Sequence, residues 1–235
     1  MANDYFQFKR FIIHQGQCAM KVGTDGVLLG AWANVEESKD ILDVGTGTGL
    51  IAIMAAQRNP FARIDAIEID ASACAQAKEN VKTCPWNERI HVCQGAIQDF
   101  NPDHRYDALL CNPPFFVRST PAPELGRTIA RHCETLTHED LLRAAERLLS
   151  SDGKLCVILP VTEAQNFIRL AQGREWFVNK LTNVFPTPQK PRKRCLIELS
   201  HSRLPYQEDS IIIETERHVY HHTFHALMRD FYLYL

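Results

Sequence analysis

The sequence predicts an α/β protein whose mostly parallel sheet is covered by helices on both faces. Apolar runs alternate with amphipathic helical patterns from residue 40 to about residue 200. Strands that alternate with helices in this way form parallel sheets. Two late apolar runs, 177–184 and 195–199, are joined by a polar connection and predict an antiparallel strand at the sheet edge. We expect seven strands in this sheet.

Each expected element follows from its own pattern of apolar residues. Strands are expected at 41–44, 63–69, 89–93, 107–111, 154–159, 177–184 and 195–199. Helices are expected at 50–58, 71–81, 140–149 and 163–172. A helix within 20–32, with Asp25 as its N-cap, precedes this core, and a strand at 211–213 and a helix at 223–232 follow it. We therefore predict one domain, with an extension at 1–39, a core at 40–200 and a docking tail at 201–235.

Composition narrows the class of protein. The chain has 235 residues and a net charge of −2, so a nucleic-acid partner must be held by local basic patches. The N-terminus has no signal-peptide pattern, and no apolar run approaches the length of a membrane span. Its eight cysteines have no metal-ligand spacing and predict buried free thiols in a reducing, cytoplasmic setting. No membrane and no obligate protein partner are indicated.

A glycine loop follows the first core strand. Asp43 is followed by Gly45, Thr46, Gly47 and Gly49, and Leu50 stands where a dinucleotide fingerprint has its third glycine. The DxGxGxG pattern resembles the loop of S-adenosylmethionine (SAM) methyltransferases. Backbone N–H groups and the following helix N-terminus would meet the cofactor's carboxylate, and Asp43 its amino group. A plain tight turn is the less favoured alternative.

Two further segments predict contacts with the rest of such a cofactor. Glu68 ends the second strand about twenty residues past the loop, where an acidic side chain reaches ribose hydroxyls. Asp70 competes for this role, although its alternative is the N-cap of the next helix. In the loop after the third strand, Ile97 is a candidate for packing on the adenine ring. Ala96 and Asp99 flank it, and a polar loop without a role is an equally good interpretation.

The most informative stretch is Asn112-Pro113-Pro114-Phe115. Two prolines end the strand at 107–111, because neither can donate to a sheet ladder. The Asn112 side chain and the Pro113 carbonyl remain as acceptors, and Phe115 offers a flat apolar face. Together these groups form a cup that fits a planar group carrying an NH2. Combined with the glycine loop, it predicts methylation of an amine, with a flipped base stacked on Phe115.

Basic segments are candidates for contact with RNA phosphates. The densest run lies between the last two core strands and contains Lys190, Arg192, Lys193 and Arg194, with Lys9 and Arg10 as possible additions. A loop after the acceptor motif contains Arg118, Arg127 and Arg131. For both segments a solvated surface is the alternative. Four histidines between 218 and 225 are interpreted as packing or surface residues, and no metal site is predicted.

The chain resembles the bacterial tRNA (adenine-N6)-methyltransferases that modify an anticodon-loop adenosine of valine tRNA. The glycine loop and the acceptor motif are shared with many nitrogen methyltransferases. The stretches 21–30 and 230–233 narrow the choice to this family. The resemblance implies a Rossmann-like SAM-dependent methyltransferase fold, SAM as cofactor, and the adenosine at tRNA position 37 as substrate. Ala96 stands where the family has an acidic residue, and Phe115 where tyrosine is commoner.

Two other enzymes and one non-enzyme remain as alternatives. A protein glutamine N5-methyltransferase would use the same cup, but such enzymes need an N-terminal helical domain for which 39 residues leave little room. An rRNA amine methyltransferase is expected to be a longer, duplicated chain. A non-catalytic SAM-binding subunit is disfavoured by the intact acceptor motif.

Overall fold

The structure is a computed structural model that describes residues 4–18, 20–113 and 136–235. Five of the predicted site residues lie outside these ranges, namely Pro114, Phe115, Arg118, Arg127 and Arg131. Their roles therefore remain predictions.

The central feature is an eight-stranded sheet with the order β10-β8-β9-β7-β6-β3-β4-β5. Its strands are β3 (Asp40–Val44), β4 (Arg63–Glu68), β5 (Ile90–Gln94), β6 (Tyr106–Cys111), β7 (Leu149–Pro160), β8 (Phe177–Phe185), β9 (Arg194–Ser200) and β10 (Gln207–Ile212). β9 runs antiparallel to both of its neighbours, whereas the other pairs of this sheet are parallel.

The predicted class, a mostly parallel sheet with helices on both faces, is confirmed. Two details were wrong. The sheet has eight strands rather than seven, because β10 from the predicted tail pairs with β8. The antiparallel strand β9 is also not at the edge, since it lies between β7 and β8. The connection between β8 and β9 is a hairpin, which leaves β8 free to accept another strand on its outer side.

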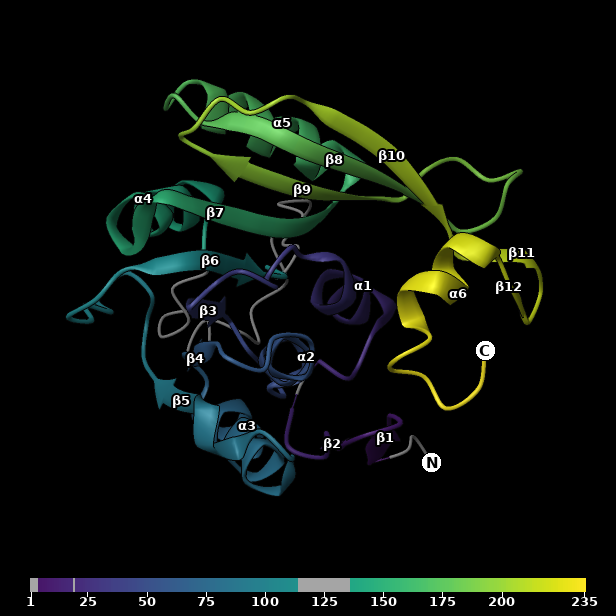
Figure 1. Cartoon of the computed structure of the whole chain (residues 1–235), viewed down its shortest axis with the longest axis horizontal. Coiled ribbons are helices and arrows are strands. Elements are labelled where there is room, and N and C mark those ends of the chain that lie inside the picture. Colours follow the sequence, from purple (N-terminus) through teal and green to yellow (C-terminus); the bar gives the residue numbers. More distant parts are fainter. Residues whose placement is uncertain (1–3, 19, 114–135) are drawn as a thin grey trace, which may run out of the picture.

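Helices pack on the two faces of the sheet in separate groups (Figure 1). One group is α1 (Thr24–Trp32), α2 (Leu50–Arg58), α3 (Ala71–Thr83) and α6 (His222–Met228). The other is α4 (His138–Leu148) and α5 (Val161–Gln172). The helices between successive parallel strands change face after β5, as expected when right-handed crossovers first move outward from β3 in one direction and then in the other. None of the helices in the described ranges is long and apolar enough to cross a membrane.

The two ends of the chain meet beside the first group of helices. The hairpin β1 (Tyr5–Gln7) and β2 (Ile12–His14) lies near α2 and α3, and the Phe8 backbone bridges to Tyr232. β11 (Glu214–Glu216) and β12 (Val219–Tyr220) precede α6, whose N-cap is His221. Buried aromatic side chains from both ends therefore complete the core.

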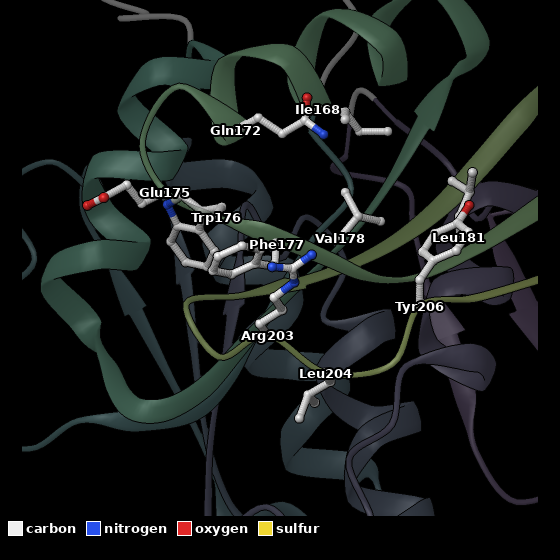
Figure 2. A pocket seen from close by; sticks show the side chains of 10 residues that line it. All are labelled: Ile168, Gln172, Glu175, Trp176, Phe177, Val178, Leu181, Arg203, Leu204 and Tyr206. Atoms are coloured by element: carbon white, nitrogen blue, oxygen red, sulfur yellow. The ribbon is translucent and has the colours of Figure 1, made fainter.

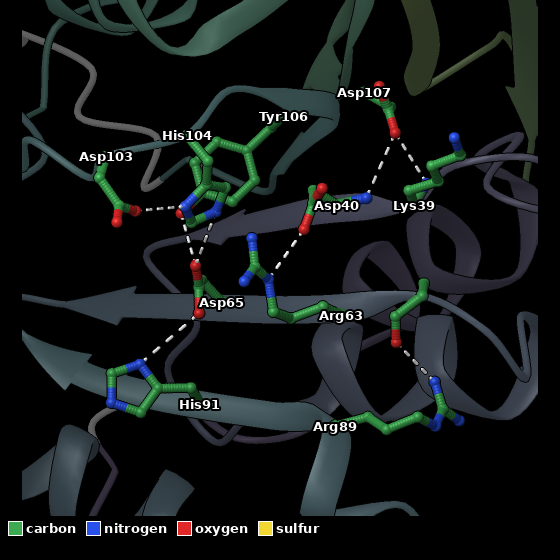
Figure 3. A network of polar contacts seen from close by, with 11 residues as sticks. Lys39, Asp40, Arg63, Asp65, Arg89, His91, Asp103, His104, Tyr106 and Asp107 are labelled. Atoms are coloured by element: carbon green, nitrogen blue, oxygen red, sulfur yellow. Dashed lines mark hydrogen bonds and ion pairs between the residues drawn. The ribbon is translucent and has the colours of Figure 1, made fainter.

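A polar network ties strand beginnings together at the edge opposite the strand ends (Figure 3). The Tyr106 hydroxyl donates to Asp65 at 2.6 Å, and nitrogens of His91 and His104 lie 3.5 and 3.4 Å from the same carboxylate. Arg63 pairs with Asp40 at 2.8 Å.

The described cysteines, which exclude Cys133, are free thiols, and all of them except Cys93 are buried. This confirms the expectation of buried free thiols for these residues.

Candidate active site

The candidate site lies where the sheet changes its direction of winding. From β3 the chain moves through β4 to β5, and it then returns to β6 on the other side of β3. The crevice outside the carboxyl ends of two such strands is the usual ligand site in open α/β sheets. Val44 is paired with Cys111, so Gly45 and Asn112 leave the sheet side by side. The glycine loop and the acceptor motif therefore meet at one crevice.

The glycine loop is folded by backbone conformations that only glycine adopts readily. Gly45, Gly47 and Gly49 have φ angles of 68°, 58° and 83°, in the left-handed region. A methyl group added at Gly45 or Gly47 would have no atom within 4 Å, so open space adjoins both residues. α2 begins directly after this loop, with Gly49 as an N-cap that has no side chain. Its first N–H groups are therefore suited to an anionic group.

Asp43 is fully buried at the base of the loop. One carboxylate oxygen accepts hydrogen bonds from the Thr46 hydroxyl at 2.5 Å and the Ala52 amide at 3.1 Å. The other oxygen accepts none from the residues that the structure describes. Burial raises the pKa of Asp43 to about 7, although the Thr46 and Ala52 hydrogen bonds lower it. A buried, unpaired carboxylate oxygen is costly, and an ammonium donor from a ligand would satisfy it.

The hydrogen bonds of Glu68 and Asp70 show that the two carboxylates have different roles. The two Glu68 oxygens accept from the Gly47 amide at 2.8 Å and from the Asp70 amide at 3.0 Å, so Glu68 connects β4 to the glycine loop. The Asp70 carboxylate instead accepts from the Ala73 amide at 2.8 Å and caps α3. The N-cap expected of Asp70 is confirmed. The ribose role of Glu68 stays a prediction that this placement supports.

The loop after β5 is held by a residue that sequence reasoning missed. Ile97 is buried in this loop. Arg147, in the last turn of α4, donates to the Ile97 carbonyl at 2.8 Å and also to the carbonyl of Phe100. A part-buried guanidinium that binds backbone carbonyls fixes a loop without any local sequence signal. Arg147 therefore positions the segment predicted to contact adenine.

The acceptor motif leaves a free acceptor at the strand end. Asn112 is half-buried and Pro113 is buried directly after β6. The Asn112 Oδ1 atom is buried and accepts no hydrogen bond from any described residue. A buried amide oxygen without a hydrogen-bond donor destabilises the folded state by about 1–3 kcal/mol. Sites that bind a polar substrate retain such unpaired groups, because the substrate satisfies them. The structure thus supports the predicted amine-binding role of Asn112.

Asn80 is a second residue that the sequence analysis did not select. Its side chain is fully buried and donates to the Thr48 carbonyl in the glycine loop and to the His14 carbonyl, both at 2.8 Å. Its Oδ1 accepts from the His14 amide at 2.9 Å. The available signal was an asparagine on the apolar side of the helix, three residues after Ala77 and four before Cys84. Asn80 joins the N-terminal hairpin to the cofactor loop.

The predicted basic run forms the hairpin between β8 and β9, and it lies at the same edge as the site. Arg194 pairs with Pro160 at the carboxyl end of β7. Lys190 and Lys193 are exposed. Arg192 donates to Asn183 at 2.6 Å, and Arg194 donates to Asp25 at 2.7 Å. The four cations are therefore not equivalent, since the two arginines bind side chains of the protein.

Two expectations about the N-terminal region were wrong. The N-cap of α1 is Gly23, whereas Asp25 lies inside the first turn and faces Arg194. Lys9 and Arg10 do not join the basic hairpin. They line a different hollow with Arg58 and Arg229.

A hollow of about 550 Å³ lies away from the crevice, between α5, β8 and the chain that follows β9 (Figure 2). Phe177 and Val178 line it at the start of β8, and Phe177 pairs with Ser200 at the far end of the β8–β9 ladder. The Arg203 guanidinium lies 5.9 Å from the centroid of the Phe177 ring. This hollow is therefore at the wrong edge of the sheet to hold the reacting groups.

The fold and the crevice define a methyltransferase. A family model described as "Methyltransferase small domain" matches residues 21–170, which include the glycine loop and the acceptor motif. A relative from Parabacteroides distasonis and another from Trichodesmium erythraeum, both named tRNA1(Val) (adenine(37)-N6)-methyltransferase, are each 46% identical over 99% of this chain and 99% of their own. The chain belongs to the tRNA1(Val) (adenine(37)-N6)-methyltransferase family.

Solved structures support the fold. A structure described as a "predicted O-methyltransferase" from Agrobacterium tumefaciens superposes with a TM-score of 0.71 at 20% identity, covering 88% of this chain and 96% of its own. At this identity the likeness concerns the fold alone. It confirms the Rossmann-like methyltransferase architecture that the sequence predicts.

Proposed function

We propose that this chain transfers a methyl group from SAM to the exocyclic N6 of adenosine 37 in tRNA1(Val). The observation that carries the proposal is the buried, unpaired Asn112 Oδ1 at the end of β6, beside the glycine loop. The close relatives, matched over almost their whole length, bear the name of this reaction. A tRNA substrate also favours a cytoplasmic enzyme, and no obligate protein partner is required by the proposal.

The residues of the crevice fit SAM. The unpaired Asp43 oxygen suits the ammonium of its methionine part, and the uncapped N-terminus of α2 suits the carboxylate. Glu68 is held at the end of β4 where ribose hydroxyls are bound in such sheets. Ile97 offers an apolar surface for adenine. When bound, SAM supplies an electrophilic methyl group on a sulfonium.

The acceptor side orients and activates the amine. The Asn112 Oδ1 and the Pro113 carbonyl accept its two N–H bonds, which favours a pyramidal nitrogen with an available lone pair. Alignment of this lone pair with the methyl group then lowers the barrier, because positioning alone can supply about 7–11 kcal/mol. Pro114 and Phe115 complete the cup in this proposal, with Phe115 stacked on the flipped base.

RNA binding is assigned to the edge of the sheet that carries the crevice. Lys190 and Lys193 are exposed on the β8–β9 hairpin and suit phosphate oxygens, and Arg192, which also donates to Asn183, lies between them in sequence. Arg118, Arg127 and Arg131 follow the acceptor motif in sequence and are proposed as further contacts. With a net charge of −2, the chain depends on such local patches to attract tRNA.

Mass spectrometry of tRNA nucleosides tests the proposal. tRNA1(Val) isolated from cells that lack the gene should contain unmodified adenosine at position 37, and N6-methyladenosine should return when the gene is restored. Restoration with the Asn112→Ala variant should not return it. The proposal is wrong if the modification is present without the gene.

A further inference from the structure

The N-terminal turn of α1 is held by an ion pair to the basic hairpin. The Arg194 Nε donates to an Asp25 oxygen at 2.7 Å, and both side chains are mostly covered, with 31% and 23% of their surfaces exposed. These residues are 169 positions apart in sequence. Arg194 is the first residue of β9 and Asp25 is the second of α1. The pair therefore joins the two segments at the carboxyl edge of the sheet.

The same turn of α1 lies close to Asn112 and to the start of α2. A methyl group added at Gly26 would lie 3.3 Å from the Leu50 side chain and 3.9 Å from the Asn112 Nδ2. Leu50 is the first residue of α2, immediately after the glycine loop. A glycine at this position therefore lets α1 approach the acceptor motif and the cofactor loop together. A shift of this turn would therefore act on both Leu50 and Asn112.

The far end of α1 is also fixed to the late strands. The indole N–H of Trp32 donates to the Thr182 hydroxyl at 2.8 Å in a buried contact. The Lys180 ammonium lies 5.2 Å from the Trp32 ring. Both partners are on β8. The helix is thus held at each end by the β8–β9 hairpin, and the Asp25–Arg194 pair is the attachment nearest to the site.

The hairpin cations consequently divide into two kinds. Lys190 and Lys193 are exposed at the turn, whereas the Arg194 guanidinium is turned toward α1. A phosphate that bound Arg194 would have to displace or share it with a carboxylate at hydrogen-bond distance. The Asp25 carboxylate occupies the Arg194 Nε–H and repels a second negative charge beside it, so a phosphate contact at Arg194 is disfavoured.

We propose that Arg194 and Asp25 are positioning residues for methyl transfer, which set the first turn of α1 against Asn112, and that Arg194 does not contact the RNA. The role of Asn112 in this inference rests on the proposed function. The pair acts through the helix, because neither residue needs to touch the substrate. It removes Arg194 from the predicted phosphate contacts and leaves the lysines in that role.

A double-mutant cycle in the full-length enzyme tests the pairing. Arg194→Gln and Asp25→Asn should each lower kcat about 10–100-fold, the range expected when a reacting group is misplaced by about 1 Å. Affinity for tRNA1(Val) and its dependence on salt should stay unchanged. The double variant should be no slower than the slower single variant, because the second change removes an interaction already lost. Additive losses would overturn the proposal.

A matched ion pair provides the control. Arg63 and Asp40 form an Nε–carboxylate contact of 2.8 Å at the opposite edge of the sheet (Figure 3), so Arg63→Gln removes the same chemistry away from the site and should leave kcat unchanged. If Arg194→Gln instead weakens tRNA binding and lowers the slope of log affinity against log salt by about 0.7–0.9, Arg194 is an RNA contact and the proposal is wrong.

A spectroscopic measurement separates this proposal from the proposed function. The side-chain amide resonances of Asn112, measured by 15N NMR on the protein without RNA, should shift in Arg194→Gln and in Asp25→Asn, but not in Arg63→Gln. Unchanged Asn112 resonances in Arg194→Gln would overturn the positioning role. This result does not depend on any substrate, whereas absence of methyl transfer by the wild type would refute the proposed function alone.

Discussion

The cofactor side and the acceptor side of the crevice differ in how their polar groups are satisfied. On the cofactor side, both Glu68 oxygens accept backbone N–H groups, and Asp43 binds Thr46 and Ala52 through one oxygen while only its other oxygen is left unpaired by the described residues. On the acceptor side, the buried Asn112 Oδ1 accepts nothing from the described residues. The chain itself therefore organises the cofactor loop, whereas the acceptor group is left for the substrate to satisfy.

Because of this difference, we expect changes on the two sides to affect different quantities, SAM affinity and turnover. Changes on the cofactor side should first alter affinity for SAM, because those residues also hold the loop in its binding conformation. Changes on the acceptor side should first alter turnover, because the acceptor is used when the amine reacts.

Replacement of Asn112 is expected to have the largest effect. Asn112→Ala should lower kcat about 10²–10³-fold, the usual cost of removing one group that acts in the transition state, while SAM affinity stays within about twofold of wild type. Single-turnover kinetics and calorimetric titration measure the two quantities. Asn87→Ala is the control, since Asn87 is exposed before β5. Near wild-type turnover of Asn112→Ala would contradict the account.

Replacement of Glu68 should have the opposite signature. Glu68→Ala removes a charged acceptor for ribose and two internal hydrogen bonds, so SAM affinity should weaken by about 1.5–3 kcal/mol. Turnover at saturating SAM should change much less. Calorimetry with Asp70→Ala provides the comparison, because loss of that N-cap should cost stability of about 1 kcal/mol rather than affinity. Unchanged affinity in Glu68→Ala would move the ribose role elsewhere.

The exposed lysines of the hairpin are expected to affect RNA binding alone. Lys190→Ala combined with Lys193→Ala should weaken tRNA binding and reduce the salt slope by about 0.7–0.9 for each lost phosphate contact. SAM affinity should not change. Filter binding at several salt concentrations measures the slope. If the slope matches wild type, the hairpin is a solvated turn, and the segment with Arg118, Arg127 and Arg131 becomes the main candidate.

Asp43 should give a smaller, pH-dependent effect on stability. Its pKa is raised from 3.8 to about 7 in the folded chain, so between these values the folded state keeps a proton that the unfolded state has lost. The resulting stability is fully present below the unfolded pKa and is lost as pH rises through about 7. Without SAM, the wild-type Tm should therefore fall between pH 5 and pH 8 more than the Tm of Asp43→Asn. Parallel Tm profiles would show that Asp43 is not responsible.

The parallel half of the fold could be predicted from the sequence, because each of its elements is defined by residues that are adjacent in sequence. The apolar runs before Asp43 and Asn112 mark buried strands, and the three glycines specify a turn that few other residues allow. The helix at 50–58 was predicted with the bounds that α2 shows. These elements need only neighbouring residues to define them, so the glycine loop and the acceptor motif were each placed correctly at the end of a strand, and the pairing of Val44 with Cys111 then brings them together.

The remaining parts depend on contacts between distant segments. β9 lies inside the sheet because the β8–β9 hairpin pairs with β7 through β9. The spacing of apolar residues along the chain does not indicate this strand order. Asp25 was expected to be an N-cap because aspartate favours that position, yet Arg194 holds it inside the first turn. Asn80 and Arg147 act through backbone carbonyls of the site loops, and such partners are visible only in three dimensions.

The most direct test of the account is methyl transfer from labelled SAM to two tRNA1(Val) transcripts, one with adenosine and one with guanosine at position 37. The account predicts incorporation into the adenosine transcript by the wild type, at least about 10²-fold slower incorporation with Asn112→Ala, and none into the guanosine transcript with either enzyme. Equal labelling of both transcripts, or undiminished labelling by Asn112→Ala, would contradict it.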